Sequence, residues 1–152
     1  MATCDWIYEK KASSGVDARV WGQRGRESCS EIEDGLEVTL GDELESFVET
    51  VGNVSIGPFM LAIAGGAGSE MSAIAETKAS RESARIPLSL VKIMDHAGES
   101  YFYDTLSFEV VVFDSLNIDR SMPTLSFGSF DEFLNWLFEE ARRQLEDPEF
   151  AF

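Results

Sequence analysis

Residues 129–145 (SFDEFLNWLFEEARRQL) predict an amphipathic helix that must be covered by other structure. Ser129 and Glu132 have the spacing of a capping box, and Pro148 cannot continue the helix. Large side chains of this kind stabilise by about 1.5–3 kcal/mol each when buried, so the stripe represents about 10 kcal/mol or more. An isolated helix cannot bury such a stripe. The apolar residues at helical spacing are Phe130, Phe133, Leu134, Leu137, Phe138, Ala141 and Leu145.

Two further helices are expected in the first half of the chain. Ser30 and Glu33 form a second capping box and predict a short acidic helix, which Gly35 weakens. Thr39 is the expected cap of a helix over 40–51, which Gly52 ends. Short apolar runs at 54–56 and 59–64 predict strands, whereas 69–85 reads as a short strand followed by a polar loop.

Three strands in succession are expected over 89–94, 100–104 and 108–113, and this spacing predicts an antiparallel meander. Helices before a sheet and a helix after it indicate an α+β fold. We therefore expect the N-terminal helices and the C-terminal amphipathic helix to pack on the sheet, with 40–51 and 130–145 covering one face.

The chain divides by composition into a short extension and one domain. Residues 6–8 and 18–21 flank the turn-like segment ASSGVD and predict a hairpin, and GQRGRES reads as a flexible link. We expect 1–29 to be an N-terminal extension that the core does not need, 30–147 to be the domain, and 148–152 to be a C-terminal tail.

The charge is strongly acidic and unevenly distributed. The sequence has 28 acids and 12 bases, a net charge of −16. Residues 1–30 hold four acids and five bases, so residues 31–152, with 24 acids and seven bases, carry −17. Such a surface repels nucleic acid and anionic membranes and attracts basic partners. An alternative is that the acidity serves only to keep the protein dissolved.

Catalytic groups at a suitable spacing are scarce. The glycine-rich stretch 65–68 (GGAG) lacks the lysine of a phosphate-binding loop, and His96 is the only histidine. His96 with Asp95 and Glu99 is a weak candidate for a metal or acid–base site, and Asp104 with Asp114 for paired carboxylates. We therefore expect no enzyme activity, no metal and no cofactor.

The two cysteines and the N-terminal residues indicate the cellular compartment of the protein. Cys4 and Cys29 do not form a disulfide framework, and the start MATCDWIYEKK lacks the apolar middle of a secretory signal. No apolar run approaches the ~20 residues of a membrane span. We expect a cytoplasmic protein.

The order of these motifs resembles the SUKH superfamily. The segment EIEDGLEVTLGDELESFVETVGN resembles its front helices, and IPLSLVKIMDHAGESYFYDT resembles its central hairpin. FEVVVFD followed by SFGSFDEFLNWL resembles its last strand and capped terminal helix. The chain departs from that pattern in lacking a tryptophan-rich start of the core and in carrying residues 1–29. The resemblance implies an immunity protein that binds a bacterial toxin domain, or a regulator related to fungal cell-wall assembly.

The function expected from this resemblance is immunity: the protein binds a cognate toxin and occludes the active site of that toxin. A nuclease is one class of toxin that fits this expectation. A non-enzymatic intracellular interaction or scaffold module is the alternative, and a small nucleotide-binding enzyme is a third reading. A basic toxin would contact acidic side chains that imitate a phosphate backbone. The expected partner-binding residues are Glu31, Glu33, Asp34, Glu37, Asp42, Glu43, Glu45, Glu49, Asp114 and Asp119.

Overall fold

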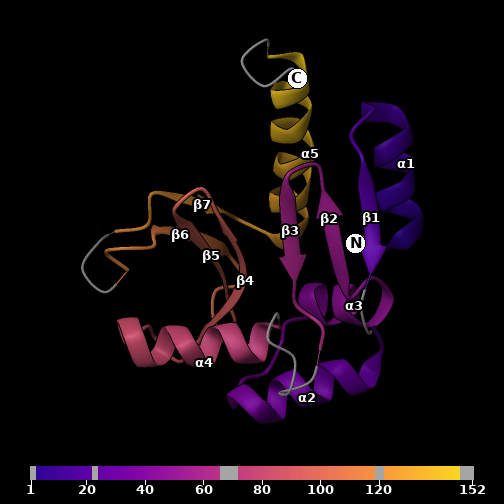
Figure 1. Ribbon diagram of the computed structural model, residues 1–152. Helices are drawn as coiled ribbons and strands as arrows, with labels where there is room; N and C mark the ends of the chain where they lie inside the picture. Colours follow the sequence, from indigo (N-terminus) through magenta and orange to yellow (C-terminus); the bar gives the residue numbers. More distant parts are fainter. Residues whose placement is uncertain (1–2, 22–23, 66–71, 119–121, 148–152) are drawn as a thin grey trace.

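A computed structural model describes residues 3–21, 24–65, 72–118 and 122–147. These residues form five helices and two antiparallel sheets, which confirms the expected α+β class (Figure 1). In chain order the elements are α1 Cys4–Ser14, β1 Ala18–Trp21, α2 Arg26–Leu36, α3 Asp42–Thr50, β2 Asn53–Ile56, β3 Phe59–Ala62, α4 Ala73–Ala84, β4 Leu90–His96, β5 Glu99–Asp104, β6 Val110–Asp114, β7 Leu125–Phe127 and α5 Phe130–Glu146.

The expected meander is present as a four-stranded sheet in the order β4-β5-β6-β7. β4 and β5 are joined by a tight turn in which Ala97 and Gly98 both have positive φ, as a two-residue hairpin turn requires. β6 pairs Val110 with Tyr103 of β5 and, on its other side, with Phe127 of β7. The short strand β7 is not among the strands expected from the sequence.

The C-terminal helix α5 packs between the two sheets, as its apolar stripe predicts (Figure 1). Its N-terminus carries the expected capping box, because Ser129 Oγ accepts a hydrogen bond from the Glu132 N–H at 3.1 Å. The Glu132 carboxylate accepts in turn from Gly128 N–H at 3.0 Å. Phe133 is fully buried against Tyr101 of β5, with ring centroids 5.7 Å apart. Only Leu145 leaves the expected stripe, since its side chain is exposed near the end of the helix.

A second sheet, in the order β1-β2-β3, involves residues that we had assigned to an extension. The predicted hairpin in residues 6–21 is wrong, because residues 4–14 form a helix and only 18–21 form a strand. Thr3 caps this helix by accepting from Trp6 N–H at 3.2 Å, and Gly15 ends it in the left-handed conformation. β1 pairs with β2, with Ala18 opposite Ile56. The extension therefore contributes a strand to the sheet and Ile7 to the core.

The helices differ from the expected ones mainly in where they begin. α2 begins at Arg26, so Ser30 lies within the helix, and the expected boundary at residue 30 falls inside α2. Likewise, α3 begins at Asp42, with Gly41 rather than Thr39 at its N-cap. A glycine stands at the N-cap of both helices: Gly41 is extended, with a φ of −72°, whereas Gly25 has a φ of 129°, which favours glycine.

The expected strand and loop over 69–85 is also wrong where the structure describes it, because 73–84 form α4. Ser72 caps this helix by accepting from Ala75 N–H at 3.2 Å. The face turned to the protein has Ile74 as its one large apolar residue, and the rest are small or polar, so the sequence shows no apolar stripe. Thr77 on this face accepts a hydrogen bond from Lys92 N–H at 2.8 Å and so attaches α4 to β4. Residues 69–71 lie outside the described part of the chain.

Candidate functional site: an acidic face beside an aromatic pocket

The eight expected acids between 31 and 49 lie on the α2–α3 pair, and two of them have structural roles. Glu33 Oε2 accepts a hydrogen bond from Leu40 N–H at 3.2 Å, which holds the loop between the two helices. Glu43 accepts from the backbone N–H of Phe130 and so joins α3 to α5. Both carboxylates therefore serve the fold by accepting hydrogen bonds from backbone N–H groups.

The side of the pair where α2 and α3 meet concentrates negative charge around Cys29. The Cys29 thiol donates to the Glu45 carbonyl oxygen at 3.4 Å, so the helices lie in contact there. The pKa of Cys29 is raised to about 11, mostly by burial and in smaller part by the carboxylates of Glu49, Glu45 and Glu33. Glu45 and Glu49, which lie beside this thiol, are half-buried, and Glu31 on α2 is half-buried as well.

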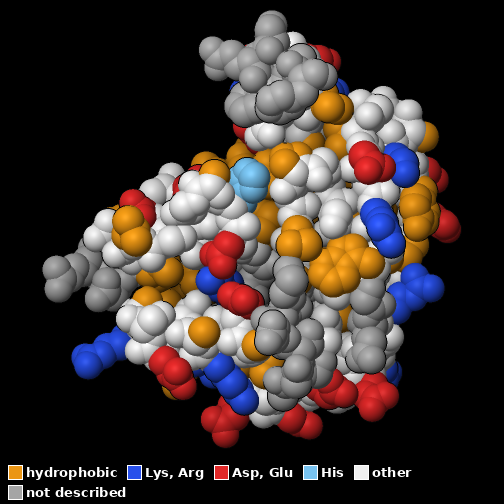
Figure 2. Space-filling model, in the orientation of Figure 1, with side chains coloured by type: hydrophobic (Ala, Val, Ile, Leu, Met, Phe, Trp, Pro, Cys, Tyr) orange, Lys and Arg blue, Asp and Glu red, His pale blue; other side chains and the backbone are white. Residues whose placement is uncertain are grey.

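The exposed members of the expected set are Asp34, Glu37 and Asp42. With their half-buried neighbours they form the acidic face, which we define as Glu31, Asp34, Glu37, Asp42, Glu45 and Glu49. Figure 2 shows acidic side chains along the lower edge of the molecule, where Figure 1 places α2. This face carries charge that the fold itself does not use for caps.

The two loop acids do not join this face. Asp114 ends β6 opposite Glu99, at the end of β5 that is far from Tyr103, and its carboxylate accepts from Leu116 N–H at 2.9 Å. Asp114 is therefore a turn residue away from the α2–α3 pair, and its part in partner binding stays a prediction. Asp119 lies outside the described residues.

A pocket of about 600 Å³ opens next to the acidic face, where the N-terminal ends of α3 and α5 meet the loop after β5. We call it the Phe108 pocket. No lysine or arginine of the described chain lines it. Its lining residues are Thr39, Leu40, Gly41, Asp42, Glu43, Tyr103, Thr105, Phe108, Gly128 and Ser129.

Phe108 lies in this pocket in an unusual backbone conformation. Its φ of 62° falls in the left-handed region, which a bulky residue rarely adopts, yet half of its side chain is exposed. The turn is held by Asp104, whose carbonyl accepts from Phe108 N–H at 2.8 Å and whose carboxylate accepts from Leu106 N–H at 2.9 Å. Strain of this kind is concentrated at binding and catalytic sites.

Gly41 allows Phe108 and Tyr103 to approach the start of α3. A Cβ atom at Gly41 would lie 2.5 Å from the Phe108 ring and 2.8 Å from the Tyr103 hydroxyl. The Tyr103 side chain is fully buried, and its hydroxyl makes no hydrogen bond to any residue that the structure describes. Burial raises the pKa of Tyr103 to about 12, with smaller contributions from Glu43, Asp104 and Asp42. The pocket therefore holds a neutral hydroxyl next to carboxylates.

A shallower hollow adjoins the Phe108 pocket and shares Thr39 and Thr105 with it. Two exposed leucines line this hollow, Leu88 at 73% and Leu106 at 80% exposure. We define Leu88, Leu106 and Phe108 as the apolar rim. The rim was missed in the sequence, although two large apolar residues within the turn DTLSFE were a usable indication of it.

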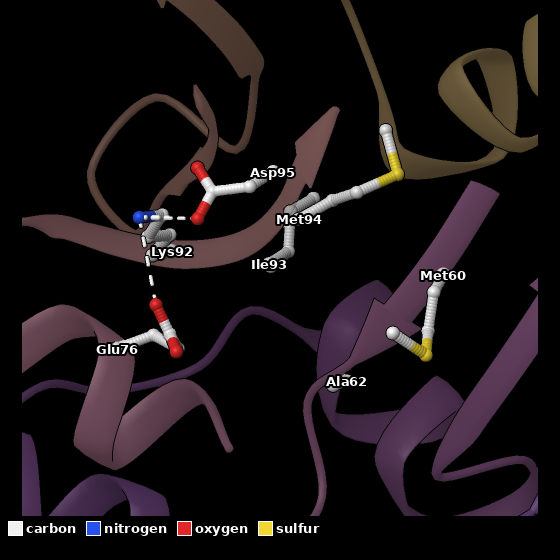
Figure 3. A pocket seen from close by; sticks show the side chains of 7 residues that line it. All are labelled: Met60, Ala62, Glu76, Lys92, Ile93, Met94 and Asp95. Atoms are coloured by element: carbon white, nitrogen blue, oxygen red, sulfur yellow. Dashed lines mark ion pairs between the residues drawn. The ribbon is translucent and has the colours of Figure 1, made fainter. Parts of the chain in front are cut away.

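Another hollow lies between the two sheets, where β3 faces β4 (Figure 3). Met60 and Met94 line its apolar side. Its one cation, among the residues that line it, is Lys92, which lies 2.6 Å from Asp95 and 3.5 Å from Glu76. Because two carboxylates already neutralise Lys92, the hollow offers no unpaired charge to a phosphate.

The weak catalytic candidates are not assembled into a site. His96 packs against Phe59, with ring centroids 4.5 Å apart, and Asp104 and Asp114 lie at opposite ends of β5 and its partner β6. The described residues contain no group of three or more histidine, cysteine and acidic side chains that could hold a metal ion. Of the stretch 65–68, only Gly65 lies within the described part of the chain.

The sequence matches the profile of the SUKH_5 group, described as SMI1-KNR4 cell-wall, over residues 8–139. The chain belongs to the SMI1-KNR4 family. The SUKH resemblance is thereby confirmed, and the SMI1-KNR4 match includes residues 8–29, which we had placed outside the domain.

A solved structure supports the same fold. The crystal structure of a protein from Pseudomonas syringae pv. tomato superposes with a TM-score of 0.60 at 18% sequence identity. The similarity covers 77% of this chain and 83% of that one. No curated protein matches the sequence significantly. No helix of the described residues has the length and apolar character needed to cross a membrane.

Proposed function

We propose that this SMI1-KNR4 protein is a cytoplasmic immunity protein, which binds a basic bacterial toxin domain and occludes its active site. The observation that carries the proposal is the position of the acidic face directly beside the apolar rim. Charge and apolar surface together are what a specific protein interface requires, because charge steers the encounter and buried apolar contacts slow dissociation. A nuclease is one toxin class with a suitable basic surface.

The alternative within the family is an intracellular interaction module without a toxin, and it would use the same surface. A third candidate, a nucleotide-binding enzyme, has little support from the geometry, because Lys92 is paired with Asp95 and Glu76. We therefore propose that the protein is not an enzyme, needs no cofactor or metal, and binds neither nucleic acid nor membranes. Its partner is a protein.

The test first asks whether the adjacent gene encodes a toxin, and then measures association with that gene's product at two salt concentrations. The Debye length falls from about 10 Å at 0.1 M to about 3 Å at 1 M, so salt should slow association if charge steers the encounter. The double variant Asp34→Lys/Glu37→Lys should slow association at low salt. Its control is Glu9→Lys/Asp17→Lys, which changes the net charge equally on exposed positions before α2.

Two results would contradict the proposal. One is the absence of binding to the neighbouring gene product, which would leave the interaction module as the remaining reading. The other is an equal loss of association rate in both double variants, which would mean that total charge, and not the acidic face, attracts the partner.

A further inference from the structure

We propose that the Phe108 pocket binds the guanidinium group of an arginine side chain from the partner protein. This inference deepens the proposed function, on which it rests for the identity of the partner. Three observations point to it: carboxylates without a compensating base, an exposed aromatic ring in a strained backbone, and a buried hydroxyl without a hydrogen-bond partner among the described residues.

The charge of the pocket selects a cation. Asp42 and Glu43 both line it, and the nearest strand ends in Asp104. The exposed carboxylate of Asp42 makes no hydrogen bond or ion pair with any described residue, whereas the Glu43 carboxylate already accepts a hydrogen bond from the Phe130 N–H. Asp42 is therefore available to an incoming cation.

The two helix N-termini at the pocket do not make it an anion site. At α5 two of the N–H groups of the first turn are already capped, because Glu43 accepts from Phe130 and Ser129 from Glu132. At α3 the first turn carries Asp42, Glu43 and Glu45, whose full charges exceed the partial positive charge of a helix end. An anion in the pocket would be repelled by these carboxylates.

The aromatic part of the pocket favours arginine over lysine. A guanidinium is planar, stacks on an aromatic face and can form two parallel hydrogen bonds with one carboxylate. Phe108 supplies a half-exposed ring and Asp42 supplies the carboxylate. The Tyr103 hydroxyl, beside the Phe108 ring at Gly41, supplies an acceptor that the fold leaves unused. The compact ammonium group of a lysine would pair with the Asp42 carboxylate but would not stack on the Phe108 ring.

The test is an NMR titration of the ¹⁵N-labelled full chain with N-acetyl-arginine amide, with N-acetyl-lysine amide at the same ionic strength as the comparison. We expect saturable shifts of the backbone amides of Gly41, Thr105, Phe108 and Gly128, and at least about fivefold weaker binding of the lysine compound. Phe108→Ala and Asp42→Asn should each weaken the arginine compound at least about fivefold. Glu82→Gln, an exposed acid on α4, is the control and should not change the affinity.

A second variant separates loss of binding from loss of folding. Gly41→Ala keeps an ordinary backbone conformation, since Gly41 has a φ of −72°, but its Cβ displaces the Phe108 ring. Gly41→Ala should abolish the shifts that the arginine compound causes at the amides of Thr105 and Gly128. The amide signals of α5 should stay dispersed, as they are in the folded protein. Tyr103→Phe removes only the hydroxyl and should weaken arginine relative to lysine.

Equal affinity for both compounds, or shifts spread over the acidic face that Asp42→Asn leaves unchanged, would overturn the proposal. The arginine pocket and the immunity function can be contradicted independently of each other. A toxin that binds Phe108→Ala and Asp42→Asn as tightly as the unaltered protein would contradict the arginine pocket and leave immunity standing. Arginine binding without any toxin binding would contradict immunity and leave the pocket standing.

Discussion

The Glu43 carboxylate on α3 accepts a hydrogen bond from the backbone N–H of Phe130, the first residue of α5. One helix thus caps another that lies 87 positions away in the sequence. The same contact brings Phe130 against Phe47 of α3, with ring centroids 4.8 Å apart. The first prediction concerns this link.

We expect Glu43→Ala to lower the free energy of unfolding by about 1–2 kcal/mol, because it leaves an N–H at the start of α5 without its partner. Glu43→Gln should lose less, since the amide oxygen still accepts. Urea unfolding measures both, with Asp34→Ala on the exposed side of α2 as a control expected within about 0.5 kcal/mol of the unaltered protein. Equal stability of Glu43→Ala and Asp34→Ala would show that the cap contributes nothing.

The buried stripe of α5 gives the second prediction. Phe133→Ala and Leu137→Ala should each cost about 2–5 kcal/mol, because both side chains are fully buried between the sheets. Leu145→Ala, on an exposed residue of the same helix, is the matched control. Unchanged urea midpoints in both core variants would contradict the packing described for α5.

Residues 4–21 give the third prediction, which reverses the expectation that the extension is dispensable. Ile7 is fully buried in the main core, so Ile7→Ala should cost about 2–5 kcal/mol, whereas the adjacent exposed Tyr8→Ala should cost little. A chain that starts at Ser30 lacks β1 and should lose much of its stability, because β2 then has an unpaired edge. A truncated chain that unfolds cooperatively with an unchanged midpoint would restore the original expectation.

Alkaline stability gives the fourth prediction. Burial raises the pKa of Cys29 from 9.0 to about 11 and those of Tyr101 and Tyr103 from 10.0 to about 12. The folded state therefore keeps protons that the unfolded state releases, so these groups stabilise fully below pH 9 and stability is lost as pH rises from 9 to 12. A shift of two units corresponds to about 3 kcal/mol per group.

Urea unfolding at a series of pH values checks this loss. Tyr103→Phe cannot ionise and should lose less stability than the unaltered protein above pH 10. A stability that stays constant from pH 9 to 12, or an identical pH dependence of Tyr103→Phe, would contradict the assignment.

The parts of the fold that the sequence predicted are those whose signals are local. The capping box and stripe of α5 lie within 17 residues, and β4 to β6 are consecutive strands joined by short turns. α4 and α1 were missed for one common reason. Ile74 is the one large apolar residue on the buried face of α4, and Ile7 is the one buried residue of α1, so no helical apolar period is visible in either.

The site was only partly predictable because its members come from distant segments. The sequence located the acidic residues of α2 and α3, but it could not distinguish Glu33 and Glu43, which cap backbone groups, from Asp34 and Asp42, which do not. The Phe108 pocket exists because Gly41, Tyr103 and Gly128 meet in three dimensions. No spacing along the chain encodes that meeting.

The two open sheets have a consequence for how this protein behaves in concentrated solution. β7 is the outer strand of the four-stranded sheet, so one side of its backbone can pair with another copy, and it has an exposed leucine at position 125. At neutral pH the net charge of −16 keeps copies apart. Near the isoelectric point of about 4.3 that repulsion vanishes. The acidity, which we propose to serve recognition, thus also protects the sheet edges from self-association, and mild acid removes this protection.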